Sequence, residues 1–151
     1  MYTVDYRSKL QDYLEKEIEV VKSLNLDEIN TVMNVLEEAK NQGKTTYICG
    51  NGGSAATASH FVCDFNKGLN DEASQFNCVC LSDNTPIMMA ISNDIGYEET
   101  FRYQIKGRIK EGDIFFGISG SGNSANVING MEYAKSIGAK TIALVGYDGG
   151  K

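Results

Sequence analysis

The chain has 151 residues, of which 42% are hydrophobic and 23% charged, a composition typical of one globular domain with its own core. Its formal net charge of −6 argues against nucleic-acid binding, because such proteins carry a basic stripe. No apolar run has the length needed to cross a bilayer, and the first residues do not read as a signal peptide. We therefore expect no membrane partner and a cytoplasmic protein.

Two amphipathic helices are predicted ahead of the first strand. In the first, within residues 4–24, apolar side chains recur at helical spacing. They are Leu10, Leu14, Ile18 and Val21. Asp27 is the expected N-cap of the second helix, and Gly43 is expected to end it. We predict that residues 1–43 form a helical hairpin, whose first apolar stripe packs either on a sheet or on a partner subunit.

From Lys44 onward, strand and helix patterns alternate. The predicted strands are 45–49, 75–81, 113–119 and 140–145, and the predicted helices are 54–65, 86–93 and 124–137. Thr85 is the expected cap of the middle helix. A further helical stretch from Gly96 should turn Phe101, Ile105 and Ile109 inward.

This alternation is typical of a parallel sheet with right-handed crossovers. We expect a three-layer α/β/α fold with a flavodoxin-like sheet of order 2-1-3-4. The pattern stops after the fourth strand, so we expect the core to lack a C-terminal strand and helix. In domain terms, residues 1–151 are predicted to be a single domain, with the hairpin at 1–43 and an incomplete core at 44–151.

The four cysteines are predicted to be reduced residues that fill small spaces in the core. They are Cys49, Cys63, Cys78 and Cys80, and no two of them have CxxC spacing. Metal binding or a disulfide is the less favoured interpretation.

Two glycine-rich segments nearly repeat each other: residues 50–55 read GNGGSA and residues 120–125 read GSGNSA. Each follows an apolar β-type run and begins a helical segment, which makes a preformed anion site at a helix N-terminus. In a 2-1-3-4 sheet they follow neighbouring strands at the switch point, where open α/β sheets bind ligands. We predict one phosphate held from both sides. The alternatives are tight turns with helix-capping serines, and a dinucleotide loop without its expected acidic partner.

A histidine and a carboxylate are predicted to share one helix face beyond the first loop. His60 is the only histidine and lies about 9 Å along the helix from Ser54, and Asp64 follows at i+4. Such a pair can move a proton or bind a metal, although a structural histidine is an equally good interpretation. Asn93 and Asp94 read as a turn, with binding of sugar hydroxyls as the functional alternative.

Taken in order, residues 49–54, 60–61, 91–94, 112–113, 117–128 and 146–151 resemble the sugar isomerase (SIS) domain, and specifically its phosphoheptose isomerase branch. The resemblance implies an aldose–ketose isomerase that converts sedoheptulose 7-phosphate to D-glycero-D-manno-heptose 7-phosphate through an enediol. It places that reaction in heptose biosynthesis for lipopolysaccharide or capsule. It also implies a homotetramer with sites at subunit interfaces.

The same resemblance assigns roles to individual residues. It implies that the sugar phosphate is bound by Asn51, Gly52, Gly53, Ser54, Asn93, Asp94, Ser119, Gly120, Ser121 and Ser124. His60 and Asp64 become the catalytic residues and the ligands of one zinc ion per site.

The sequence departs from the family pattern in two ways. Asp64 stands where the family has glutamate, and the family's Gln and His on a last helix are not matched here. Residues 54–56 and 60–61 also resemble a related branch that binds the bacterial replication initiator. The alternative function is therefore a non-catalytic module that binds a phosphosugar or a protein.

Overall fold

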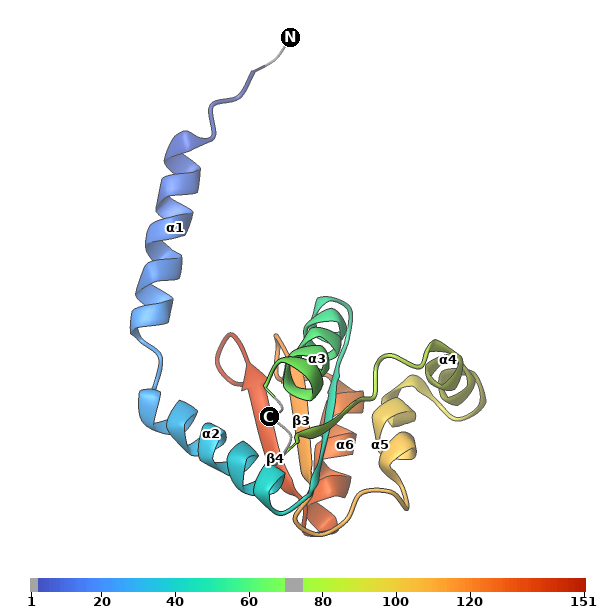
Figure 1. Cartoon of the computed structure of the whole chain (residues 1–151). Coiled ribbons are helices and arrows are strands. Elements are labelled where there is room, and N and C mark those ends of the chain that lie inside the picture. The colour runs from blue at the N-terminus through green and yellow to red at the C-terminus, as the bar shows by residue number, and fades with distance from the viewer. Residues whose placement is uncertain (1–2, 70–74) are drawn as a thin grey trace. The chain divides into compact units, whose positions relative to one another are not determined.

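The computed structural model describes residues 3–69 and 75–151, whose elements are labelled in Figure 1. The chain divides into two compact units, Met1–Met33 and Asn34–Lys151, and each is described separately. Within the described residues, no helix combines the length and the apolar character that crossing a membrane requires.

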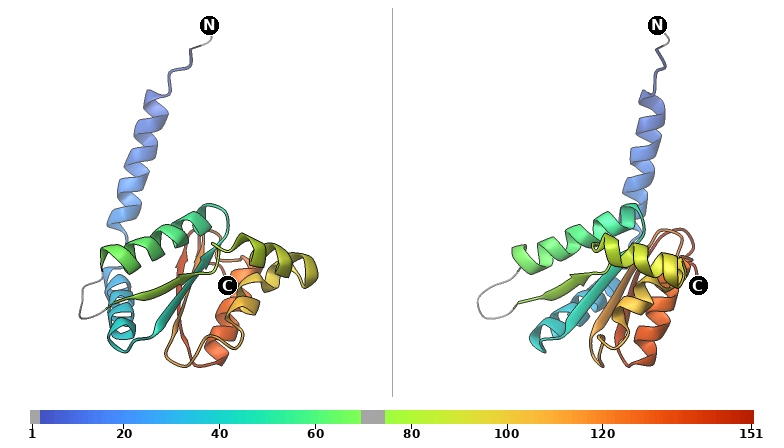
Figure 2. Two further views of the ribbon diagram at one scale, coloured as in Figure 1. Left: turned by 45° about the vertical axis from the view of Figure 1, so that its right-hand side comes forward. Right: turned by 90° about the vertical axis from the view of Figure 1, so that its right-hand side faces the viewer.

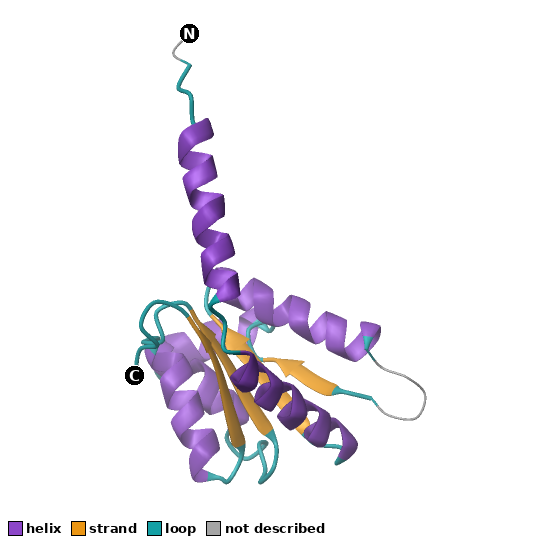
Figure 3. Cartoon of the chain, turned by 90° about the vertical axis from the view of Figure 1, so that its left-hand side faces the viewer, coloured by secondary structure: helices purple, strands orange, loops and turns teal. Residues whose placement is uncertain are grey.

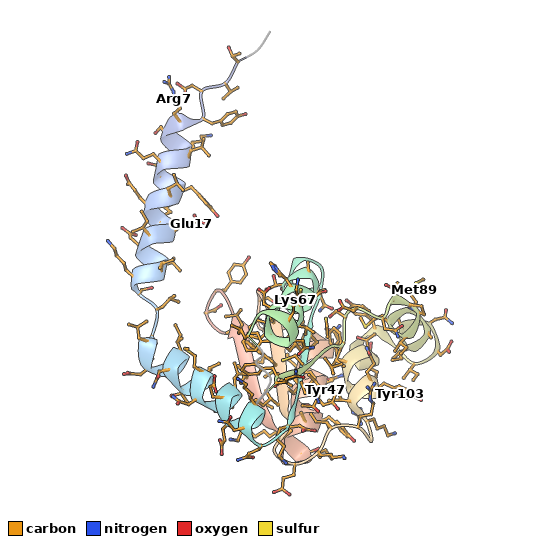
Figure 4. The ribbon with its side chains drawn as sticks, viewed as in Figure 1. Arg7, Glu17, Tyr47, Lys67, Met89 and Tyr103 are labelled. Atoms are coloured by element: carbon orange, nitrogen blue, oxygen red, sulfur yellow. The ribbon has the colours of Figure 1, made fainter. Side chains whose placement is uncertain are left out.

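The first unit contains α1 (Arg7–Lys22) and the beginning of α2 (Leu26–Asn41). No residue of α1 is buried, and its side chains project from the helix on all sides (Figure 4). The predicted apolar stripe is present but exposed. Its exposed fractions are Leu10 58%, Leu14 56%, Ile18 52% and Val21 65%.

The predicted cap of α2 is wrong by two residues. Asn25 caps the helix, because its Oδ1 accepts the backbone N–H groups of Asp27 at 3.1 Å and Glu28 at 3.3 Å. Asp27 instead lies in the first helical turn, where its charge is favourable at the positive end of the helix.

The second unit is a parallel four-stranded sheet between helical layers, as predicted (Figure 2). Its strands are β1 (Thr45–Gly50), β2 (Asn77–Cys80), β3 (Ile114–Ser119) and β4 (Lys140–Val145). They lie in the order β2-β1-β3-β4, which confirms the flavodoxin-like arrangement. Its helices, besides the end of α2, are α3 (Gly53–Cys63), α4 (Thr85–Asp94), α5 (Thr100–Ile105) and α6 (Ala125–Ser136). Figure 3 shows the strands running side by side between these helices.

The central strands β1 and β3 are buried on both faces, whereas most residues of β4 are exposed. On the face covered by α5 and α6, Tyr47 and Phe115 join one core cluster with Phe101 and Ile105, and the predicted inward positions are confirmed. The side chain of Tyr47 is labelled within this unit in Figure 4. On the face covered by α3, aromatic rings make a second core. Phe61 lies edge-on to Phe116 at 5.3 Å between centroids and stacks on Phe65 at 4.1 Å.

Several predicted boundaries differ from the structure. Helix α4 is capped by Asn84, whose Oδ1 accepts the N–H of Ile87 at 3.1 Å, and Thr85 is its first residue. Helix α3 continues as a π-helical turn, Asp64–Gly68, instead of ending near residue 65. This turn presents Asn66, whose amide bonds both the N–H and the carbonyl of Cys78 at 2.9 and 2.8 Å. The outer edge of the short strand β2 is thereby hydrogen-bonded.

Candidate functional site

The two glycine-rich loops meet at the carboxyl ends of adjacent strands, as the predicted sheet order requires. Gly50 at the end of β1 is in register with Ile118 of β3, so the loops begin side by side. Two reciprocal hydrogen bonds, each 2.9 Å long, join the side-chain amides of Asn51 and Asn126. The structure therefore brings both segments to the switch point of the sheet.

In the first loop, backbone donors face outward at the start of α3. Ser54 donates its N–H to the carbonyl of Asn51 at 3.0 Å, whereas the N–H groups of Gly52 and Gly53 have no acceptor among the described residues. Gly50 permits this tight entry, because a Cβ there would lie 2.7 Å from the Cβ of Ser54. The loop thus offers two free donors at a helix N-terminus, which is the geometry of an anion site.

In the second loop, three serines surround a tight turn. The hydroxyls of Ser119 and Ser124 are hydrogen-bonded at 3.0 Å, and the Ser121 hydroxyl accepts the N–H of Asn123 at 3.1 Å. Ser124 is the N-cap residue of α6, but its side chain makes no capping hydrogen bond, and Ser54 lies inside α3. The hydroxyls of Ser54 and Ser124 therefore do not cap the two helices, which argues against the interpretation that these serines serve only as helix caps. The loop backbone is fixed from outside by Gly146, which donates its N–H to the carbonyl of Gly120 at 3.1 Å.

The histidine and the carboxylate lie close together, as their spacing predicts, with His60 on α3 and Asp64 at the start of the π-helical turn that follows it. His60 Nε2 and Asp64 Oδ1 are 3.5 Å apart, and their side chains are 77% and 63% exposed. They line a hollow of about 380 Å³ with Ala56, Thr57 and Phe61. Among the described residues, no hydrogen bond or ion pair connects this pair with the two loops. His60 belongs to the helix that begins at the first loop, and Asp64 follows the end of that helix.

Asn93 and Asp94 form the end of α4, and the Nδ2 of Asn93 donates to Oδ1 of Asp94 at 2.7 Å. Asn93 also lines a hollow of about 400 Å³ whose other walls are Met88, Met89, Ser92 and Tyr97. The Tyr97 hydroxyl donates to Oδ1 of Asn51 at 2.7 Å, which ties the chain after α4 to the first loop.

Asn126 and Tyr97 were not predicted as site residues. Asn126 is 1% exposed, and a buried asparagine at the start of a helix indicates a structural or functional role. The sequence alone does not show that this residue is buried. The link from Tyr97 spans 46 residues of chain, so no local pattern indicates it.

The cysteine beside the first loop is a packing residue. Cys49 is fully buried, and burial raises the pKa of its thiol well above its ordinary value, with the neighbouring Cys80 as a smaller cause. At neutral pH it is therefore an uncharged thiol and not a nucleophile. All four cysteines are free thiols. Cys49 and Cys78 are buried, as predicted, and Cys80 is half-buried. The prediction is wrong for Cys63, which is exposed and fills no space in the core.

A metal centre is not complete within residues 3–69 and 75–151. No three side chains of His, Cys, Asp or Glu gather there in an arrangement that could hold an ion. His60 and Asp64 supply two donors of the kind that zinc accepts.

Taken together, the fold and the two loops define a parallel α/β domain with unpaired backbone donors at the switch point of its sheet. Residues 5–146 match the family model described as SIS domain, and the chain belongs to this family.

Proteins named phosphoheptose isomerase are among its relatives. A probable phosphoheptose isomerase of Thermoplasma volcanium is 39% identical over 142 residues, which cover 94% of this chain and 72% of that protein. The phosphoheptose isomerase of Helicobacter pylori strain Shi470 is 40% identical over 141 residues, covering 93% and 71%. The solved phosphoheptose isomerase GmhA from Neisseria gonorrhoeae superposes with a TM-score of 0.87 at 30% identity, covering 97% of this chain and 78% of that one.

Proposed function

We propose that the protein is a phosphoheptose isomerase, which interconverts sedoheptulose 7-phosphate and D-glycero-D-manno-heptose 7-phosphate. The observation that carries this proposal is the convergence of the two loops through Asn51 and Asn126 at the switch point. It is supported by about 40% identity to proteins of that name over nearly the whole chain.

The phosphate would be held between the loops. The free N–H groups of Gly52 and Gly53 would bind it from the start of α3. The hydroxyls of Ser119, Ser121 and Ser124 would bind it from the other side, since each can rotate its proton toward an acceptor. Charge-assisted hydrogen bonds of this kind are stronger than neutral ones, so the phosphate anchors the substrate.

The isomerisation is a proton transfer between neighbouring carbons. A base removes a proton from C1 of the ketose, and the electron pair forms the C1–C2 double bond as O2 takes a proton, which gives the enediol. O1 then gives up its proton to form the aldehyde, and a proton returns to C2, so that the net transfer is from C1 to C2 and from O1 to O2. We assign the carbon proton to Asp64 and the oxygen proton to His60, which stand 3.5 Å apart. The distance of about 9 Å along α3 from Ser54 to His60 is comparable to an extended seven-carbon chain anchored at C7.

Zinc, one ion per site, is part of the proposal. A tetrahedral ion with ligand bonds of about 2.1 Å separates two ligands by about 3.4 Å, and the His60 and Asp64 donors are 3.5 Å apart. The remaining ligands would come from outside this pair. When bound, the ion would polarise the carbonyl oxygen of the substrate. Elemental analysis should find zinc in the wild type and not in His60→Ala, and equal zinc content in both would contradict this assignment.

We also propose a homotetramer in the cytoplasm. The apolar stripe of α1, more than half exposed at Leu14 and Ile18, is the kind of surface that a second copy covers. The free thiols suit a reducing compartment. Analytical ultracentrifugation should give four times the mass of one chain, and Leu14→Glu with Ile18→Glu should give a smaller species. Lys16→Glu, on the charged side of α1, is the matched control, and an unchanged mass in the double variant would contradict the role of the stripe.

Turnover of sedoheptulose 7-phosphate tests the proposed activity directly. NMR should show the aldose product and incorporation of solvent deuterium, and Asp64→Asn should lower kcat at least 100-fold, the usual range for removal of a general base. Absence of product and of deuterium exchange at high enzyme concentration would refute the isomerase. Ligand binding without turnover would instead support the non-catalytic phosphosugar module.

A further inference from the structure

A buried asparagine outside the predicted substrate contacts uses all of its hydrogen-bonding capacity on the first loop and on helices α5 and α6. Asn126 Oδ1 accepts from Asn51 Nδ2 at 2.9 Å and from its neighbour's backbone N–H, that of Val127, at 3.0 Å. Its Nδ2 donates to Asn51 Oδ1 at 2.9 Å and to Thr100 Oγ1 at 3.2 Å. An amide side chain makes about four such bonds, so Asn126 is saturated and has none left for a ligand.

These bonds join three segments that are distant in the sequence. Asn51 belongs to the first loop, and Asn126 lies in the first turn of α6, directly after the second loop. Thr100 begins α5, and its hydroxyl donates to the carbonyl of Tyr97 at 2.8 Å. The Tyr97 hydroxyl returns to Asn51 Oδ1 at 2.7 Å. We call these four residues, Asn51, Tyr97, Thr100 and Asn126, the asparagine clamp.

The clamp fixes which way the Asn51 amide points. The backbone N–H of Val127 can only donate, so it fixes the position of Asn126 Oδ1 and leaves Asn126 Nδ2 to donate to Asn51 Oδ1. The Tyr97 hydroxyl donates to the same Asn51 oxygen. One N–H of Asn51 Nδ2 is bound to Asn126, and the second has no partner among the described residues. Asn51 directly precedes Gly52 and Gly53 in the same loop, so we infer that this second N–H is available to the anion that their backbone donors would bind.

We propose that Asn126 and Tyr97 are positioning residues, which act on the ligand only through Asn51. They hold its amide and the three segments in one geometry before the ligand enters, which lowers the ordering cost of binding. The identity of the ligand, a sugar phosphate, rests on the proposed function. The positioning of Asn51 by Asn126 and Tyr97 does not.

Tyr97→Phe is the sharpest variant, because it removes one hydroxyl from a side chain that is 53% exposed. We expect its Kd and KM for sedoheptulose 7-phosphate to rise about 3- to 10-fold, the effect of one lost hydrogen bond, with an unchanged Tm. Tyr103→Phe is the matched control, because Tyr103, whose position is labelled in Figure 4, is 51% exposed and is not a clamp residue. A shifted Tm with unchanged binding would overturn the role of Tyr97.

A double-mutant cycle tests whether Asn126 acts through Asn51. Asn126→Ala should raise Kd about 10-fold or more in the wild type, but less than about 2-fold in an Asn51→Ala background. Asn129→Ala, one turn further along α6 and bonded to the Glu98 carbonyl, controls for general damage to the helix. Equal effects of Asn126→Ala in both backgrounds would overturn the proposal.

The hydrogen bonds of the clamp can be measured by NMR without substrate. A negative result for the clamp can therefore be distinguished from a negative result for the isomerase activity. In NMR spectra, the side-chain amide signals of Asn51 and Asn126 should exchange slowly and shift together in Tyr97→Phe. An unaffected Asn51 signal would overturn the clamp, whatever the activity. Absence of turnover with these signals present would refute only the proposed function.

Discussion

The spacing between β3 and α6 sets the position of the second loop, and Gly117 sets that spacing. A methyl group added at Gly117 would lie 2.6 Å from Val127 Cγ1, where ordinary contacts are 3.4–4 Å. Val127 is 4% exposed and belongs to the core, so it has little room to move. Gly117→Ala must therefore push α6 away from the sheet by about 1 Å.

The cost follows from overpacking. Inserting a methyl group into a filled core destabilises by about 1–3 kcal/mol, and in a domain of this size each kcal/mol lowers Tm by about 2–4 °C. We expect Tm to fall by roughly 2 to 12 °C in a thermal melt followed by circular dichroism. Because Ser124 and Asn126 begin α6, the same displacement should stretch the 2.9 Å bonds to Asn51 and raise the KM for the sugar phosphate.

A compensating substitution decides whether this contact is the cause. Val127→Ala alone should cost about 2 kcal/mol through lost burial, but in the double variant the new methyl enters the vacated space. The double variant should be more stable than the sum of the two changes by about 1–3 kcal/mol. Gly68→Ala is the control, since nothing lies within 4 Å of its added Cβ and Gly68 is not among the predicted substrate contacts. Additive effects of Gly117→Ala and Val127→Ala would refute the reasoning.

Three further predictions concern the loops, the acid–base pair and the buried thiols. Ser124→Ala removes the partner of Ser119 and one phosphate donor, so steady-state kinetics should show KM raised about 5- to 100-fold with a smaller change in kcat; an unchanged KM would contradict its role. Asp64→Glu introduces the glutamate that the family has at this position and should keep kcat within about 10-fold of the wild type. If kcat fell as far as in Asp64→Asn, the length of the side chain and not its charge would be decisive. Burial raises the pKa of the Cys78 thiol to about 11. Between about pH 9 and 11, the folded chain therefore keeps a proton that the unfolded chain loses. We expect the free energy of unfolding to fall by about 1–2 kcal/mol over that pH range. Urea unfolding at both ends of that range should show a smaller loss in Cys78→Ala, and an equal loss would exclude this thiol as the cause.

The sheet could be predicted because its signals are local. Apolar runs of five to seven residues alternating with helical patterns define the strands, and the rule for crossover connections then limits their order. The helix caps were harder, since Asn25 and Asp27 are both favoured capping residues and only the backbone conformation selects between them. The π-helical turn Asp64–Gly68 has no sequence signature, and it follows from tertiary contacts such as the bonds from Asn66 to Cys78.

The site divides along the same line. Its loops could be predicted from glycine and serine positions, but the residues that aim them could not, because Asn126 and Asn51 are 75 positions apart. Burying a polar amide costs free energy unless every group is paired, and an apolar side chain at position 126 would fill the same space without that requirement. The loops could turn without Asn126, yet the amide of Asn51 would then be free to rotate. Asn126 is fully paired, and it lies between the unpaired backbone donors of the first loop and the hydroxyl groups of the second. A requirement to hold Asn51 for the ligand therefore explains this asparagine better than a requirement to form the turn.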